Sequence, residues 1–281
     1  MMGKKVNPQQ LKTEMERLRC EPLSSGYRSI DELTGGLVRG GVVLLAARPA
    51  MGVTPLILNM ISRIVQNEQG GILFFSTEFS EREVASRILE IGMDVEPGRL
   101  LDGKMPAKEG INRCADFLQS LKGRIRIETF PMLTLEDIRY YCEETANLRL
   151  VVVDHPECIY RSMENPFEEA DRLPMDHVLR YLRHLAADLN VPVLCKTGLD
   201  RKLELREDKR PRLTDLKKGV SAELADQVLL LYRDSYYDPS YDDTAECIVA
   251  KTCCGHTGTA KMLWDWNTNR FEDDFDEFLP F

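Results

Sequence analysis

Long hydrophobic runs are missing from this sequence. No stretch of its 281 residues reaches the roughly 18 uncharged apolar residues that a membrane-spanning helix needs. Residues 1–5, Met-Met-Gly-Lys-Lys, lead into polar residues and not into the apolar core of a secretion signal. We therefore expect a cytoplasmic protein that makes no membrane contact.

A surplus of positive charge is also missing. Lys and Arg together number 37 against 46 Asp and Glu, which gives a net charge of -9. A protein that coats nucleic acid needs excess cations to neutralise the phosphates. This balance excludes a general coating function and limits any contact with nucleic acid to a local basic patch.

Closely spaced cysteines are scarce. The 8 cysteines are spread at wide intervals, mostly in apolar or helical stretches, which suits a reducing compartment better than a disulfide framework. Cys253 and Cys254 are adjacent and precede His256, but this spacing does not match the Cys-x₂₋₄-Cys pattern of structural zinc sites. We expect no metal at these cysteines.

What the sequence does contain is an alternation of apolar, β-rich runs with amphipathic segments. Near-continuous Val, Ile and Leu runs are typical of strands buried on both faces of a parallel sheet that is flanked by helices. Toward the C-terminus, hairpin-like strands replace the helices. The predicted strands are Val42–Ala46, Gly71–Ser76, Arg124–Glu128, Leu150–Asp154, Val191–Cys195, Val228–Tyr232 and Glu246–Ala250, and the predicted helices include Glu81–Ile91, Gly110–Leu121, Leu135–Ala146 and Met175–Leu189.

The predicted organisation is one α/β domain between two short flanking segments. Residues 1–24 form a polar leader with a short amphipathic helix, in which Leu11, Met15 and Leu18 recur at helical spacing. Such a helix is too short to be stable alone, so we expect it to dock on another surface. The domain extends over residues 25–271, and residues 272–281 form an acidic, aromatic tail.

The loop Ala47–Pro55, called the phosphate loop below, follows an apolar strand and precedes a segment with helical spacing. This is the setting of a phosphate-binding P-loop, which ends in Gly-Lys-Ser/Thr, and whose lysine reaches the β- and γ-phosphates. Here Gly52 is followed by Val53, Thr54 and Pro55. The loop therefore lacks the cation at Val53 and lacks a backbone donor at Pro55, because proline has no N–H.

Several motifs, in order along the chain, resemble the ATPase domain of DnaB-type replicative helicases. Residues 25–37 resemble the start of that domain, residues 46–52 (Ala-Ala-Arg-Pro-Ala-Met-Gly) its P-loop, and residues 74–79 (Phe-Phe-Ser-Thr-Glu-Phe) its glutamate-bearing strand. Residues 150–154 resemble its second Mg²⁺-associated strand and residues 229–234 a late core strand. The resemblance covers residues 25–271 and implies a RecA-like P-loop NTPase fold with ATP and Mg²⁺ as cofactors.

The resemblance also implies roles for individual residues. For Glu78 and Asp154, an alternative interpretation is open, in which two carboxylates at strand ends bond to nearby backbone. The implied catalytic residues are Glu78, Asp154 and Lys251, the degenerate nucleotide site comprises Arg48, Gly52, Val53, Thr54 and Pro55, and Thr54 and Asp154 would hold Mg²⁺ if nucleotide binds.

Three cationic or polar groups of the family are missing. Val53 replaces the loop lysine, Gly198 replaces a glutamine that senses the γ-phosphate, and Lys251-Thr252-Cys253 keeps the lysine but not the arginine finger. A charge-assisted contact contributes about 1.5–3 kcal/mol, and an arginine finger is worth on the order of 10³–10⁵ in rate. We therefore expect a protein of DNA replication that acts by binding, as a scaffold or regulator. The alternative is an active ATP-dependent helicase in which Arg48 or Lys251 replaces the missing cation.

Two further segments suggest partners. Residues 201–218, called the basic segment below, correspond to family loops that face single-stranded DNA in a ring of subunits, and a basic groove suits such binding. The alternative is a solvated loop, because no aromatic residue interrupts the segment. The candidate DNA-binding residues are Arg201, Lys202, Arg206, Lys209, Arg210 and Arg212.

The tail ends in Pro-Phe after an acidic run and resembles the C-terminal peptide of bacterial single-stranded-DNA-binding proteins. By that resemblance, Phe278, Pro280 and Phe281 would contact replication proteins. The alternative is a tail that covers the protein's own basic or apolar surface.

Overall fold

The computed structural model describes residues 22–67, 69–102, 108–121, 123–161, 171–238, 240–241 and 243–274. The predicted leader helix and the tail residues Phe278, Pro280 and Phe281 lie outside these ranges. Among the described residues, no helix is both long enough and apolar enough to cross a membrane.

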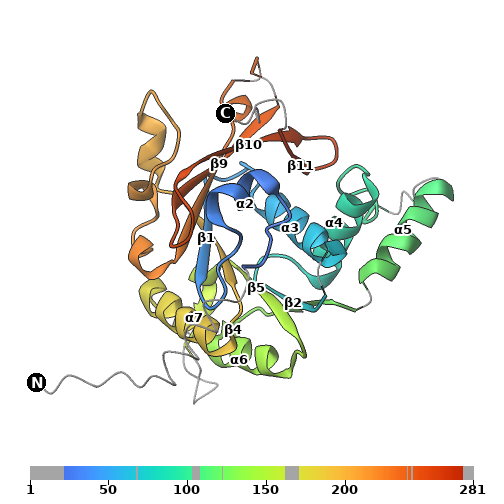
Figure 1. Ribbon diagram of the computed structural model, residues 1–281, viewed down its shortest axis with the longest axis horizontal. Coiled ribbons are helices and arrows are strands. Elements are labelled where there is room, and N and C mark those ends of the chain that lie inside the picture. Colours follow the sequence, from blue (N-terminus) through green and yellow to red (C-terminus); the bar gives the residue numbers. More distant parts are fainter. Residues whose placement is uncertain are drawn as a thin grey trace, which may run out of the picture.

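Nine strands in the described part of the chain form one sheet, in the order β11-β10-β9-β8-β1-β7-β5-β2-β3 (Figure 1). Neighbours from β8 to β3 in that order are parallel, and β9, β10 and β11 pair antiparallel. The predicted α/β class, with a mostly parallel sheet and antiparallel C-terminal strands, is confirmed. The strands are β1 Val42–Ala47, β2 Gly71–Ser76, β3 Ile125–Thr129, β5 Leu148–Asp154, β7 Val193–Gly198, β8 Gln227–Tyr232, β9 Thr244–Lys251, β10 Gly258–Asp265 and β11 Arg270–Asp273, with a separate pair of β4 Leu133–Thr134 and β6 Ile159–Tyr160.

Alternate residues of the central strands point into two apolar cores. In β1, Val43 and Leu45 belong to one core, and Val42 and Leu44 belong to the other. All residues of β1 and β8 are buried, which explains why these strands read as continuous apolar runs in the sequence. Helices cover both faces (Figure 1): α2 Arg28–Thr34, α3 Val53–Asn67, α4 Glu81–Met93 and α5 Lys108–Leu121 on one, and α6 Leu135–Glu144 and α7 Met175–Leu189 on the other.

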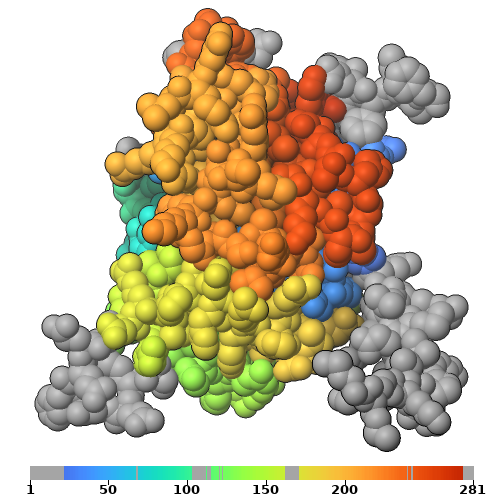
Figure 2. Space-filling model, turned by 90° about the vertical axis from the view of Figure 1, so that its left-hand side faces the viewer, coloured from blue at the N-terminus to red at the C-terminus, as the bar shows by residue number. Residues whose placement is uncertain are grey.

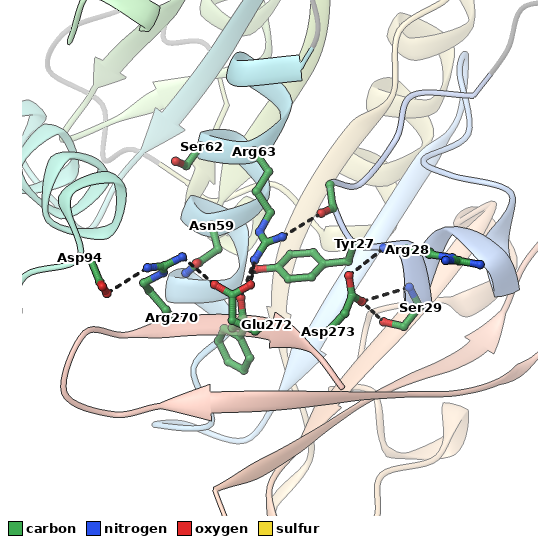
Figure 3. A network of polar contacts seen from close by, with 12 residues as sticks. Tyr27, Arg28, Ser29, Asn59, Ser62, Arg63, Asp94, Arg270, Glu272 and Asp273 are labelled. Carbon is green, nitrogen blue, oxygen red and sulfur yellow. Dashed lines mark hydrogen bonds and ion pairs between the residues drawn. The ribbon is translucent and has the colours of Figure 1, made fainter. Parts of the chain in front are cut away.

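Helix α2, which has no counterpart among the predicted helices, is capped from the far end of the chain. Its N-cap residue Tyr27 makes no side-chain capping bond. Instead, Asp273 of β11 accepts hydrogen bonds from the backbone N–H groups of Arg28, at 3.1 Å, and Ser29, at 3.0 Å (Figure 3). The Ser29 hydroxyl also donates to Asp273. A carboxylate at a helix N-terminus accepts hydrogen bonds from otherwise unpaired N–H groups, and its negative charge interacts favourably with the helix dipole.

Arg63 ties the same corner to α3, the helix that follows the phosphate loop. Its guanidinium donates to the carbonyl oxygens of Gly26, at 3.3 Å, and Phe271, at 3.0 Å, and forms an ion pair with Glu272 (Figure 3). It also lies 4.4 Å from the ring centre of Tyr27. The first and last described segments of the domain are therefore fastened to α3.

We predict that Asp273→Ala lowers the free energy of unfolding by about 2 kcal/mol, because buried N–H groups at the start of α2 lose a charged acceptor. Urea unfolding measures this change. The matched control is Asp116→Ala, which removes an exposed carboxylate of α5 and should shift stability by less than about 0.5 kcal/mol. Equal effects of the two variants would contradict the capping role.

Candidate functional site

A cavity of about 520 Å³ opens at the carboxyl ends of β1, β2, β5 and β7. The ends of parallel strands meet at one edge of the sheet, which is where α/β proteins bind their ligands. The lining brings together residues predicted from separate motifs. It comprises residues 47–55, Glu78, Phe79, Arg87, His155, Glu157, residues 196–199, Lys217, Trp264 and Asn269.

The phosphate loop is held in a tight turn by Arg233, which follows β8, and by Phe271 of β11. Ala50 and Gly52 have positive φ angles of 64° and 100°. The guanidinium of Arg233 donates to the carbonyl oxygens of Ala50, at 2.8 Å, and Met51, at 3.0 Å. A Cβ atom added to Gly52 would lie 3.0 Å from Cζ of Phe271, so both φ and packing favour glycine at this position. The turn thus persists through internal contacts.

The two residues that depart from a working loop occupy the first turn of α3. Val53 begins the helix and packs against the apolar core, and its side chain carries no charge. Pro55 is tolerated in a first turn because its missing N–H would have no partner within the helix. The next backbone N–H, of Leu56, donates to the carbonyl oxygen of Gly52 at 2.9 Å. The loop therefore has the turn of a phosphate-binding loop but lacks the lysine and one of the backbone N–H donors that would bind a phosphate.

Lys196 of β7 supplies a cation to the cavity that the sequence analysis did not identify. Its ammonium lies 2.9 Å from Oγ1 of Thr54 and 2.7 Å from Oδ1 of Asp154. It also lies 3.3 Å from Oε2 of Glu78. Lys196 thus contacts both predicted Mg²⁺ ligands and the predicted catalytic glutamate at once.

A sequence signal for Lys196 exists. The residue continues the apolar run Val191–Cys195, and its side chain is only 13% exposed. A lysine within a buried strand must find an anionic partner, because an isolated buried charge costs several kcal/mol. The predicted strand stopped one residue short of this lysine, whereas β7 extends to Gly198.

Asp154 is fully buried at the end of β5. Burial raises the pKa of its carboxyl group, but the contact with His155 and the charge of Lys196 together hold this pKa below its ordinary value. His155 has a positive φ of 62°, and its Nδ1 lies 3.4 Å from Oδ1 of Asp154 and 3.3 Å from Oε2 of Glu78. Asp154 is therefore an ionised carboxylate whose charge is balanced by the adjacent ammonium of Lys196.

The residues around Asp154 do not fit Mg²⁺ in this arrangement. Glu78, Asp154 and His155 do place ligand atoms within 4.8 Å of one another, as a metal site would. However, the ammonium of Lys196 lies against the Thr54 and Asp154 oxygens that Mg²⁺ would need. A second cation at the same oxygens would be repelled at very short range.

A second lysine lies where the resemblance implies a glutamine side chain. A Cβ atom on Gly198 would come within 2.4 Å of Cε and 2.7 Å of Nζ of Lys217. The Lys217 ammonium lies 3.4 Å from Oε1 of Glu157, and both residues line the cavity. Lys217 therefore occupies the space that a larger side chain at position 198 would take.

The two cations named in the sequence analysis as substitutes have other partners. Arg48 lines the cavity, and donates to Oε1 of Glu204 at 2.8 Å and to the carbonyl oxygen of Leu199 at 3.0 Å. Lys251 of β9 is not among the residues that line the cavity. Its ammonium donates to the carbonyl oxygens of Ala222, at 2.8 Å, and Ala225, at 2.6 Å. The catalytic assignment of Lys251 stays a prediction.

The basic segment is largely neutralised by its own acidic neighbours. Figure 2 shows it in amber and orange above α7, in yellow. Arg201 and Lys202 are exposed, and Lys209 lies 4.7 Å from the ring centre of Tyr237. The segment presents less uncompensated charge than its sequence suggests, and its DNA binding stays a prediction. The ion pairs are Arg206 with Asp215, Arg210 with Asp234 and Glu246, and Arg212 with Asp208.

The sequence profile of the DnaB-like helicase C terminal domain matches residues 22–273. The chain belongs to this family. It is 34% identical over 263 residues to the probable replicative DNA helicase of Trieres chinensis and 31% identical over 268 residues to replicative DNA helicase DnaB of Geobacillus stearothermophilus. These alignments cover 89% and 91% of this chain but 57% and 58% of the relatives, so the chain spans less than two thirds of their length.

Solved structures of DnaB-like proteins share the fold. The ATPase domain of G40P has a TM-score of 0.82 at 24% identity, covering 97% of this chain and all 100% of that domain. A DnaB-like replicative helicase, described with its interactions with primase, has a TM-score of 0.80 at 24% identity and covers 96% of this chain and 67% of its own. The predicted RecA-like fold and the DnaB-type resemblance are confirmed.

We predict that Lys196→Met lowers the free energy of unfolding by about 3 kcal/mol at pH 7, because removing one partner of a buried ion pair leaves the other charge buried without a counter-charge. The double variant Lys196→Met/Asp154→Asn should recover most of this loss. Urea unfolding of both variants and of Lys202→Met, an exposed lysine, tests the effect. A single variant as stable as the parent would contradict it.

A pH dependence follows from the lowered pKa of Asp154. Its ionised form stabilises the fold fully above about pH 4, the ordinary pKa of an Asp side chain, and this contribution is lost as pH falls through the lowered folded pKa. Unfolding experiments from pH 7 to pH 3 should show a shrinking stability difference between the parent and Asp154→Asn. A difference that stays constant across this range would show that the charge of Asp154 is not the cause.

Proposed function

We propose that this DnaB-like helicase domain takes part in DNA replication by binding and does not hydrolyse ATP. The observation that carries the proposal is the position of Lys196, whose ammonium contacts Glu78 and Asp154 together. These are the carboxylates that the family resemblance assigns to water activation and Mg²⁺ placement. An ammonium bound to both withholds them from those roles.

The chemistry of phosphoryl transfer explains why this matters. The reaction depends almost entirely on positioning and on stabilising the charge that develops on the transferred phosphoryl group. A carboxylate that polarises water must be aimed at that water, whereas Oε2 of Glu78 lies 3.3 Å from both Lys196 Nζ and His155 Nδ1. Val53 and Gly198 leave two further positions without their family side chains. Several of the necessary charges and contacts are thus missing together.

The binding role draws on the relatives. Their names describe replicative DNA helicases, and one related structure is described with its interactions with primase. We propose comparable partners for this chain, with single-stranded DNA reached through Arg201 and Lys202 in a ring of subunits. Replication proteins would bind the predicted tail residues Phe278, Pro280 and Phe281.

One observation favours the rival function of an active ATP-dependent helicase with an atypical loop. Lys196 places its ammonium 2.9 Å from the hydroxyl of Thr54, next to the residue that replaces the loop lysine. A cation delivered from β7 instead of α3 would then serve the phosphates. The rival requires Lys196 to release Glu78 and Asp154 when nucleotide enters.

An ATPase assay with Mg²⁺ and single-stranded DNA separates the two functions. We expect the parent protein to release phosphate at the background rate, because loss of an arginine finger alone costs on the order of 10³–10⁵ in rate. The isosteric variant Glu78→Gln serves as the matched control for contaminating activity, and should give the same rate. Turnover by the parent that disappears in Glu78→Gln would establish the rival.

A further inference from the structure

We propose that the ammonium of Lys196 takes the place of Mg²⁺ at this site, so that the cavity binds the triphosphate of a nucleotide without a metal. This inference rests on the proposed function, because a site that only holds a nucleotide needs a counter-charge but no Lewis acid. It concerns the ion requirement of the site, which departs here from the Mg²⁺ that the family resemblance implies.

The first support is the position of the ammonium between three separate elements. Thr54 lies in the first turn of α3, Asp154 ends β5, and Glu78 follows β2. Lys196 reaches all three from β7 at 2.9, 2.7 and 3.3 Å. The ammonium donates hydrogen bonds to Thr54 and Glu78 and forms an ion pair with Asp154, so these three oxygens together fix its position.

The contact between Lys196 and Glu78 is the longest of the three and is the one that a phosphate oxygen would replace. Oε2 of Glu78 lies 3.3 Å from the ammonium, and the Glu78 side chain is 48% exposed. Asp154 is closer and buried. An entering phosphate oxygen therefore displaces Glu78 and keeps the Lys196–Asp154 pair, which holds the ammonium at the cavity wall.

The second support is the charge around the same cavity. Lys217 and Arg87 line it together with Lys196, which gives three cations against the lining carboxylates Glu78 and Glu157, and Arg87 lies 4.0 Å from the ring centre of Phe79. The start of the 15-residue helix α3 also lies in the lining, and a helix N-terminus attracts phosphate. The cavity of about 520 Å³ is large enough for a bound small molecule.

The third support is the lack of room for a metal next to the ammonium. Mg²⁺ binds oxygen at about 2.0–2.1 Å in octahedral geometry. An ion at that distance from Asp154 Oδ1 and Thr54 Oγ1 would meet the ammonium that already lies 2.7 and 2.9 Å from them. Removing Lys196 would therefore open these oxygens to Mg²⁺, so a variant without this lysine should bind the nucleotide together with Mg²⁺.

Calorimetry with ATP tests the inference on the whole chain, once in EDTA and once in MgCl₂. We expect the parent to bind ATP with the same Kd in both buffers. In Lys196→Met, we expect binding in EDTA to weaken by about tenfold or more, as loss of one charge-assisted contact predicts, and MgCl₂ to restore it. The matched control is Lys218→Met, an exposed lysine that is not in the cavity lining, and it should behave as the parent.

The outcomes are distinguishable. ATP binding by the parent that disappears in EDTA would overturn the metal-free site, as would no ATP binding in either buffer, and in both cases the proposed lack of hydrolysis would stand. Turnover in MgCl₂ would overturn the proposed function. Inorganic tripolyphosphate should compete with ATP, and a failure to compete would overturn recognition through the phosphates. The comparison of buffers uses the parent protein and so decides the question even if Lys196→Met does not fold.

Discussion

The ion pair between Lys196 and Asp154 is the interaction on which the site depends. A buried carboxylate at the end of β5 needs a counter-charge, and a lysine in the buried strand β7 needs an anion. Each residue therefore accounts for the other. Because Thr54 and Glu78 contact the same ammonium, the pair also positions the start of α3 and the segment after β2.

The phosphate loop shows that shape and chemistry are held by different residues. Its turn is maintained by Arg233, which binds two loop carbonyl oxygens, and by Phe271, which packs against Gly52. Neither residue contributes a charge to a phosphate in this arrangement. A loop of this kind can keep its conformation after its own lysine has been replaced by Val53, and the cation of the cavity then comes from a neighbouring strand.

The fold was predictable from the sequence because strands that are buried on both faces of a sheet consist almost entirely of apolar residues. Every predicted strand overlaps a strand of the structure, Glu78 lines the cavity, and Asp154 lies buried at the end of β5 beside it. Contacts between polar residues that are far apart in the sequence produce no comparable pattern. Lys196 and Thr54 are 142 residues apart, and Asp273 caps a helix that begins 245 residues earlier. In the basic segment, the sequence gives the number of charges but not the partners, such as Asp215 for Arg206.

The cap that Asp273 places on α2 has a consequence for biosynthesis. Helix α2 is among the first parts of the domain to leave the ribosome, but its cap and the strand that carries it are among the last. Contacts of such long sequence separation form late, because the intervening chain must be available before its ends can meet. The seven residues of α2 are too few to form a stable helix alone, so this segment takes its final conformation only after β11 has been made.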